Sequence, residues 1–96
     1  MSDRLKGRIA IVTGAGRGIG RAVAIAYARE GATLALCSRT KDELEAAAAE
    51  VQKSGGKVFA RTVDLSVREA VRGFAEETVK RFGRIDVLVN NAGALG

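Results

Sequence analysis

The chain has 96 residues, of which 47% are hydrophobic and 28% charged, a balance typical of one small globular domain. Its formal net charge is +5, yet the 16 Lys and Arg residues are scattered among acids and form no basic run, which argues against a nucleic-acid-binding protein. No stretch approaches the roughly 20 apolar residues of a membrane span, and the N-terminus lacks the apolar core of a signal peptide. We therefore expect a cytoplasmic protein with no membrane partner.

Short continuous apolar runs alternate along the chain with longer segments of helical periodicity, which is the pattern of βαβ units. The first apolar run predicts a strand over about residues 8–13. A helix should follow over residues 18–30 and stop at Gly31. The apolar face of this helix is predicted to consist of Ile19, Val23, Ala26 and Tyr27.

The second predicted strand, residues 33–38, reads as one apolar run, as expected for a strand that is covered on both faces. It holds the single cysteine, Cys37, which we interpret as a packed strand residue rather than a redox thiol. Thr40 and Glu43 then have the spacing of a capping box, which predicts a helix over residues 41–54. The apolar stripe of that helix is Leu44, Ala47, Ala48 and Val51.

The third strand is predicted over residues 58–63. A second capping box, formed by Ser66 and Glu69, should open a helix that ends at Phe82. The fourth strand is predicted over residues 85–90, after a closing glycine. The buried face of the third helix is predicted to be Ala70, Val71, Phe74, Thr78 and Phe82.

Strands that alternate with helices in this way pair in parallel through right-handed crossovers. The fold class is therefore α/β, with sheet order 3-2-1-4, which is half of a doubly wound Rossmann fold. Ligands of such sheets bind where the strand order reverses, at the carboxyl ends of strands one and four. The glycine-rich segment after strand one and the residues after Asn90 both belong to that place.

Four glycines in seven positions, Gly14, Gly16, Gly18 and Gly20, connect the first strand to the first helix. A merely tight βα turn would need one glycine, and the Gly-Lys-Ser/Thr of a P-loop is absent. Glycines let the backbone approach phosphates, and the following helix N-terminus supplies free N–H groups and a positive dipole end. The loop therefore predicts a pyrophosphate site.

Three motifs, in matching order and spacing, resemble those of the classical short-chain dehydrogenases/reductases: Thr13-Gly14-x-x-x-Gly18-x-Gly20, then Asp64, then Asn90-Asn91-Ala92-Gly93. The resemblance covers essentially the whole chain. It implies that Gly14 permits the turn and that Gly18 and Ile19 present backbone to the pyrophosphate. It also implies that Gly20 lets the helix pack close to the sheet.

The same resemblance implies roles for the residues after strands three and four. Asp64 would accept a hydrogen bond from the adenine amino group, with Leu65 beside the ring. The segment 90–93 would line the adenosine ribose and brace the central strands. Without the resemblance, a strand-end cap remains an alternative role for Asp64.

The choice of cofactor can be argued from charge. An NAD site places an acid at the end of strand two to bind the ribose 2′-hydroxyl, but here that place holds Ser38 and Arg39, and the nearest acid is Asp42 in the next helix. Arg39 offers a planar fork for a 2′-phosphate, the Ser38 hydroxyl adds a donor, and Arg17 could approach from the other side. NADP is therefore favoured over NAD, although Arg39 could also be a solvated loop charge.

The family's catalytic Tyr and Lys, four residues apart, and its Ser and Asn cannot be placed in this chain. The single tyrosine, Tyr27, is followed four residues later by Gly31, and there is no histidine to serve as another proton relay. We interpret Tyr27 as a packing residue. The 96-residue chain alone is therefore expected to be inactive.

The favoured interpretation is a single unit, residues 1–96, truncated after the fourth strand: the N-terminal, NAD(P)-binding part of an oxidoreductase acting on a secondary alcohol or ketone. Substrate would bind only to a full-length form, expected to be a homo-oligomer. The family includes oxoacyl-carrier-protein, sugar and steroid reductases. The alternative is a non-catalytic, stand-alone nucleotide-binding or interaction module.

Overall fold

A computed structural model describes residues 4–91, and its strands and helices alternate as the sequence predicts. In chain order the elements are β1 (Ile9–Thr13), α1 (Gly18–Arg29), β2 (Thr33–Ser38), α2 (Lys41–Lys53), β3 (Val58–Thr62), α3 (Arg68–Phe82) and β4 (Val87–Asn90). All three strand pairs are parallel and the sheet order is β3-β2-β1-β4, which confirms the predicted half of a doubly wound Rossmann fold. None of the described helices is both long and apolar enough to cross a membrane.

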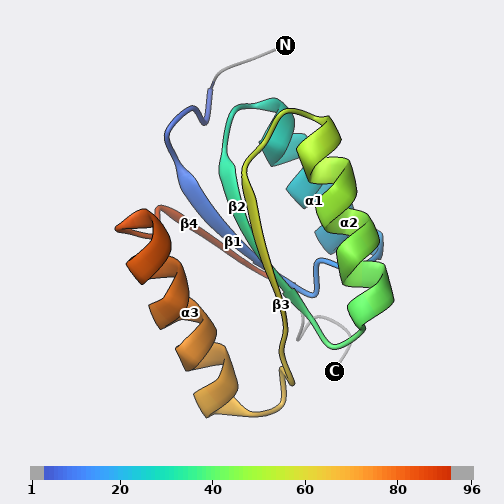
Figure 1. The fold of residues 1–96 in the computed structure, drawn as a ribbon, viewed down its shortest axis with the longest axis vertical. Coiled ribbons are helices and arrows are strands. Elements are labelled where there is room, and N and C mark those ends of the chain that lie inside the picture. Colours follow the sequence, from blue (N-terminus) through green and yellow to red (C-terminus); the bar gives the residue numbers. More distant parts are fainter. Residues whose placement is uncertain (1–3, 92–96) are drawn as a thin grey trace.

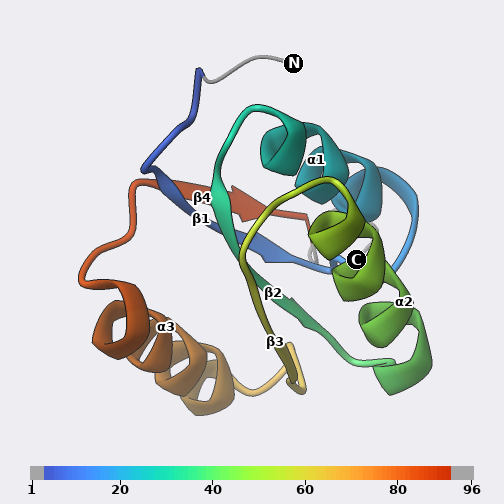
Figure 2. The ribbon, with the colours of Figure 1, turned by 45° about the horizontal axis from the view of Figure 1, so that its top comes forward.

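The sheet is covered on both faces, by α1 and α2 on one side and by α3 on the other (Figures 1 and 2). Alternate residues along β1 and β2 therefore enter two separate cores. The core on the side of α1 and α2 includes Ala10, Val12, Leu34, Leu36, Leu44 and Val51. The core on the side of α3 includes Ile11, Ala35, Cys37, Phe59, Val63 and Phe74. Burial raises the pKa of the Cys37 thiol to about 11, which agrees with a packed strand residue rather than a redox thiol.

The face of α1 that packs on the sheet differs from the predicted one. Its buried residues are Gly20, Ala24 and Ala28, whereas Ile19 is 73% exposed. A Cβ added at Gly20 would lie 2.3 Å from the carbonyl oxygen of Gly14, so helix and loop are in direct contact. The prediction was wrong because it chose the inner face by the size of the apolar side chains, while close approach to the sheet requires small ones.

Neither of the two predicted capping boxes, at Thr40 and at Ser66, forms in the structure. The Thr40 side chain caps no helical N–H, and its own N–H donates to Ser38 Oγ at 3.3 Å. The Ser66 hydroxyl donates to Asp64 Oδ1 at 2.6 Å, and α3 begins later, with Val67 as its N-cap. In both places the side chain two residues before the predicted cap, Ser38 or Asp64, competes for the groups that a capping box would use.

Candidate functional site

The segments singled out in the sequence meet at one edge of the sheet. The glycine loop follows β1, Arg39 follows β2, Asp64 lies beyond the end of β3, and Asn91 follows β4. Because the strands are parallel, these four carboxyl ends share one edge, the lower one in Figure 1. The strand order reverses here, between β1 and β4, which is where open α/β sheets bind ligands. Ala92 and Gly93 of the predicted site lie outside the described residues.

The glycine loop is held tightly against the end of β2. Gly14 and Gly18 have φ of +65° and +60°, a left-handed backbone conformation in which a residue with a side chain would be strained. The Ala15 N–H donates to the Cys37 carbonyl at 3.1 Å, and a Cβ added at Gly16 would lie 2.9 Å from Ser38 Oγ. The loop thus requires glycine for backbone conformation at two positions and for space at a third.

The loop leads into an α1 N-terminus that has no side-chain cap. Arg17 is the N-cap residue, with extended backbone (φ −159°), and the first turn contains no acidic side chain. The first N–H groups of an α-helix have no partner within the helix, and they attract anions together with the helix dipole. Since the N-cap side chain makes no hydrogen bond to these N–H groups and the first turn has no acidic side chain, this helix end is suited to bind a phosphate.

Thr13 joins the ends of the two central strands. Its hydroxyl oxygen accepts the Asn91 backbone N–H at 3.0 Å and lies 3.1 Å from Asn90 Oδ1, to which it donates. The Asn91 side-chain amide donates to the Gly14 carbonyl at 3.4 Å. These contacts fix β4 to the glycine loop. No separate role was predicted for Thr13 from the sequence. A hydroxyl side chain at the end of a buried apolar strand could nevertheless have indicated a hydrogen bond to the neighbouring strand.

Two arginines and a serine occupy the side of the site next to β2. Arg17 and Arg39 are exposed, and neither forms an ion pair with any residue in the part of the chain that the structure describes. Ser38, by contrast, is 7% exposed, and its hydroxyl oxygen accepts the Thr40 N–H while its own proton stays available to a ligand. The end of β2 thus carries a hydroxyl donor at Ser38, followed by the exposed cation of Arg39.

Asp64 is exposed at the far side of this edge. Its Oδ1 accepts both the Ser66 hydroxyl, at 2.6 Å, and the Ser66 N–H, at 3.0 Å, and these bonds, with a smaller effect of the Arg39 charge, lower the pKa of the carboxyl. Its Oδ2 accepts no hydrogen bond from the described residues. Leu65 packs against the core under α3. The geometry therefore leaves one carboxylate oxygen of Asp64 free to accept from a ligand.

The model of the short chain dehydrogenase family matches residues 8–96. The 3-oxoacyl-(acyl-carrier-protein) reductase of Thermotoga maritima is 39% identical over 90 residues, which are 94% of this chain and 37% of that protein. The solved hydroxysteroid dehydrogenase of Escherichia coli superposes with a TM-score of 0.90 at 38% identity, covering 97% of this chain and 40% of that one. A solved NAD⁺-bound xylitol dehydrogenase superposes with a TM-score of 0.90 at 40% identity, and the match covers 94% of this chain and 35% of that one.

The chain therefore belongs to the short-chain dehydrogenase family. It spans about a third of the length of the curated relatives it matches, for example 34% and 37% of two bacterial oxidoreductases. Members of this family bind nicotinamide dinucleotides, as the xylitol dehydrogenase does in its NAD⁺-bound structure.

Proposed function

We propose that residues 1–96 are the NAD(P)-binding, N-terminal part of an NADP-dependent oxidoreductase that transfers hydride between nicotinamide and a secondary alcohol or ketone. The observation that carries the proposal is the uncapped α1 N-terminus behind a glycine loop with two exposed, unpaired arginines beside it. Such an edge suits a ligand with a pyrophosphate and an additional phosphate.

In the proposed complex the pyrophosphate lies on the backbone of the glycine loop, next to Gly18 and Ile19. The adenosine extends towards β3, where the free Oδ2 of Asp64 accepts from the adenine amino group and Leu65 borders the ring. Asn90 and Asn91, together with Ala92 and Gly93, line the ribose side. The left-handed backbone of the loop and the free carboxylate oxygen support this orientation.

The 2′-phosphate is assigned to Arg39, Ser38 and Arg17. Arg39 would supply a bidentate, charge-assisted contact, and the buried hydroxyl of Ser38 would donate from below. The end of β2 has no acid to bind a 2′-hydroxyl or to repel a phosphate, since the nearest one, Asp42, lies in α2. NADP is therefore preferred to NAD in this proposal.

The bound dinucleotide supplies the hydride chemistry, and this chain's described residues bind and orient its adenosine half. The tyrosine of this chain, Tyr27, lies in α1 and packs against the core, and Gly31 rather than a lysine stands four residues after it. The names of the relatives, a 3-oxoacyl reductase and hydroxysteroid dehydrogenases, support a carbonyl or secondary alcohol as substrate. We propose that substrate and subunit contacts belong to a full-length, homo-oligomeric form, and we expect the 96-residue chain to turn over no ketone.

Equilibrium titration of the purified protein with NADPH and NADH, measured by isothermal titration calorimetry, tests the proposal. We expect binding of both, with a preference for NADPH of roughly tenfold or more, because a charge-assisted phosphate contact is lost with NADH. Absence of binding to either would contradict the dinucleotide site. Equal affinities would contradict only the assignment of the 2′-phosphate.

A further inference from the structure

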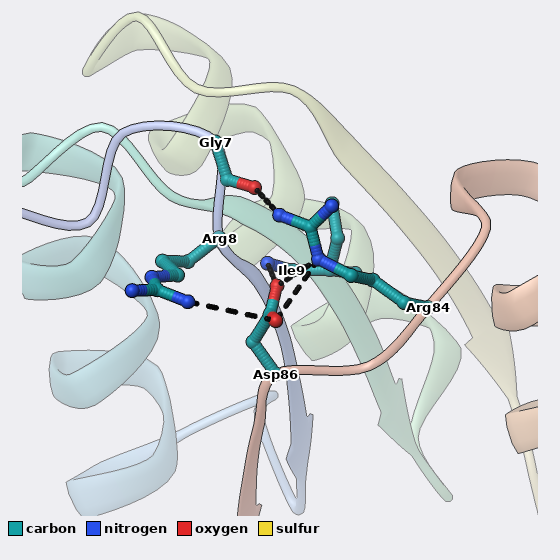
Figure 3. Close-up of polar contacts among 5 residues, drawn as sticks. All are labelled: Gly7, Arg8, Ile9, Arg84 and Asp86. Carbon is teal, nitrogen blue, oxygen red and sulfur yellow. Dashed lines mark hydrogen bonds and ion pairs between the residues drawn. The ribbon is translucent and has the colours of Figure 1, made fainter.

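A cluster of polar contacts joins β1 to β4 at the amino ends of these strands, opposite the carboxyl ends that form the site (Figure 3). Asp86 Oδ2 accepts the backbone N–H of Ile9 at 2.8 Å, and both carboxylate oxygens lie 2.9 Å from Arg84 Nε. Arg84 Nη2 in turn donates to the Gly7 carbonyl at 2.7 Å, and Arg8 Nη1 lies 3.8 Å from Asp86 Oδ1. The Asp86 side chain is only 15% exposed, whereas both arginines are 59% exposed.

The Asp86 carboxylate replaces a backbone acceptor at the start of β4. The Asp86 N–H donates to the Ile9 carbonyl at 2.8 Å. In the register that pairs Ala10 with Val87, a continued parallel ladder would offer the Ile9 N–H the carbonyl of Ile85. The carboxylate takes that place, which explains why β4 begins at Val87 rather than at Ile85 as predicted. The pairing of the two strands thus starts at one defined position.

The apolar side chains of β4 do not define its register by themselves. Val87 and Val89 pack on the side of α1 and α2, while Leu88 points to the opposite face and is 64% exposed. A one-residue slip would place Leu88 and either Asp86 or Asn90 opposite Ala10 and Val12, so a polar side chain would enter the apolar core. β4 pairs only with β1 among the described strands, so its register depends on these polar residues at its two ends as well as on burial of the two valines.

At the other end of β4 the register decides the geometry of the site. Thr13 pairs with Asn90, and the next residue, Asn91, bonds both to the Thr13 hydroxyl and to the Gly14 carbonyl. A slip of one residue would move Asn91 by about 3.3 Å, which is longer than the tolerance of a hydrogen bond.

We propose that Asp86 is a positioning residue for the dinucleotide site: by fixing the register at the start of β4, it determines where Asn90 and Asn91 meet Thr13 and the glycine loop. It acts from a distance, since four strand residues span about 13 Å. The effect on the cofactor rests on the function proposed above, whereas the effect on strand geometry does not.

The test compares Asp86→Ala, Asp86→Asn and the control Glu77→Gln by amide hydrogen exchange and NADPH titration. Glu77 on α3 also accepts from one arginine, Arg61 at 2.8 Å, and lies 3.8 Å from another, Arg81, and these partners belong to β3 and α3 rather than to β1 or β4. We expect Asp86→Ala to speed exchange of the Asn91 amide about tenfold relative to the Leu36 amide in β2, and to weaken NADPH binding about tenfold. Glu77→Gln should change neither.

Asp86→Asn retains an acceptor for the Ile9 N–H and loses the charge, so its effects should be smaller and in the same direction. If Asp86→Ala does not fold, Asp86→Asn alone tests the positioning role of Asp86. Faster exchange at Ile9 with unchanged exchange at Asn91 would overturn the positioning role, as would unchanged NADPH affinity in both variants. If the unmodified protein binds no dinucleotide, the proposed function fails, and the Asn91 exchange still shows whether Asp86 fixes the strand.

Discussion

Two aspartates at opposite ends of the strands, Asp86 before β4 and Asp64 after β3, are held ionised by hydrogen bonds within the protein. The Ile9 N–H, followed by Arg84, lowers the pKa of the Asp86 carboxyl, and the hydroxyl and N–H of Ser66 lower that of Asp64. Both carboxylates are therefore acceptors at neutral pH. One holds a strand end, and the other keeps an oxygen free in the proposed cofactor site.

These lowered pKa values predict a loss of stability in acid. A carboxyl whose pKa is lower in the folded protein binds fewer protons there, so its stabilising contribution is complete above the ordinary value of 3.8 and disappears as the pH falls through the folded pKa. Thermal unfolding measured between pH 6 and about 2 should show this loss below about pH 4. Asp86→Asn should flatten it. An identical pH dependence in that variant would show that Asp86 carries none of the effect.

At the scale of elements, the strand order, the helix ends and the inner faces of α2 and α3 followed from the sequence, while the inner face of α1 and the helix caps did not. Continuous apolar runs predicted the two central strands, β1 and β2, because both of their faces are covered. Gly31 and Gly83, with φ of +94° and +91°, end helices as predicted. The capping boxes failed because Ser38 and Asp64 compete locally. The Asp86 contact was unpredictable, since its partner N–H is 77 residues away in sequence.

Gly20 and Gly73 form a matched pair for testing the contact between α1 and the loop. A Cβ at Gly20 meets the Gly14 carbonyl oxygen at 2.3 Å, whereas one at Gly73 in α3 meets nothing within 4 Å. Gly20→Ala should lower the free energy of unfolding by about 1–3 kcal/mol through overpacking. Gly73→Ala should raise it by about 0.5–1 kcal/mol through helix propensity. Denaturant unfolding of both variants measures this, and equal effects would contradict the tight contact.

At the scale of the whole molecule, one face of the sheet ends in an uncovered apolar strand. Leu88 on β4 is 64% exposed on the side of α3, where Val79 is 43% exposed. An edge strand with an apolar side chain offers unpaired backbone and apolar surface to a second copy. The chain spans about a third of its curated relatives, whose remaining length has no counterpart here.

We therefore expect the 96-residue chain to associate at high concentration. Leu88→Lys should reduce this association, because a charge on an edge strand opposes pairing. Val67→Lys is the control, since Val67 is 44% exposed at the start of α3, away from β4. Sedimentation velocity over a range of concentrations measures the effect. A concentration-independent monomer, or equal behaviour of both variants, would contradict the role of β4.

The central claim, a 2′-phosphate site at the end of β2, is tested most directly by reversing the charge of Arg39. Lys53→Asp makes the same charge change at the other end of α2, and Arg17→Ala removes a loop cation that can also contact the shared pyrophosphate. The measurement is the ratio of NADPH to NADH affinity in each protein. We predict that Arg39→Asp reverses the preference in favour of NADH, that Arg17→Ala lowers it less, and that Lys53→Asp leaves it unchanged. An unchanged ratio in Arg39→Asp would contradict the account.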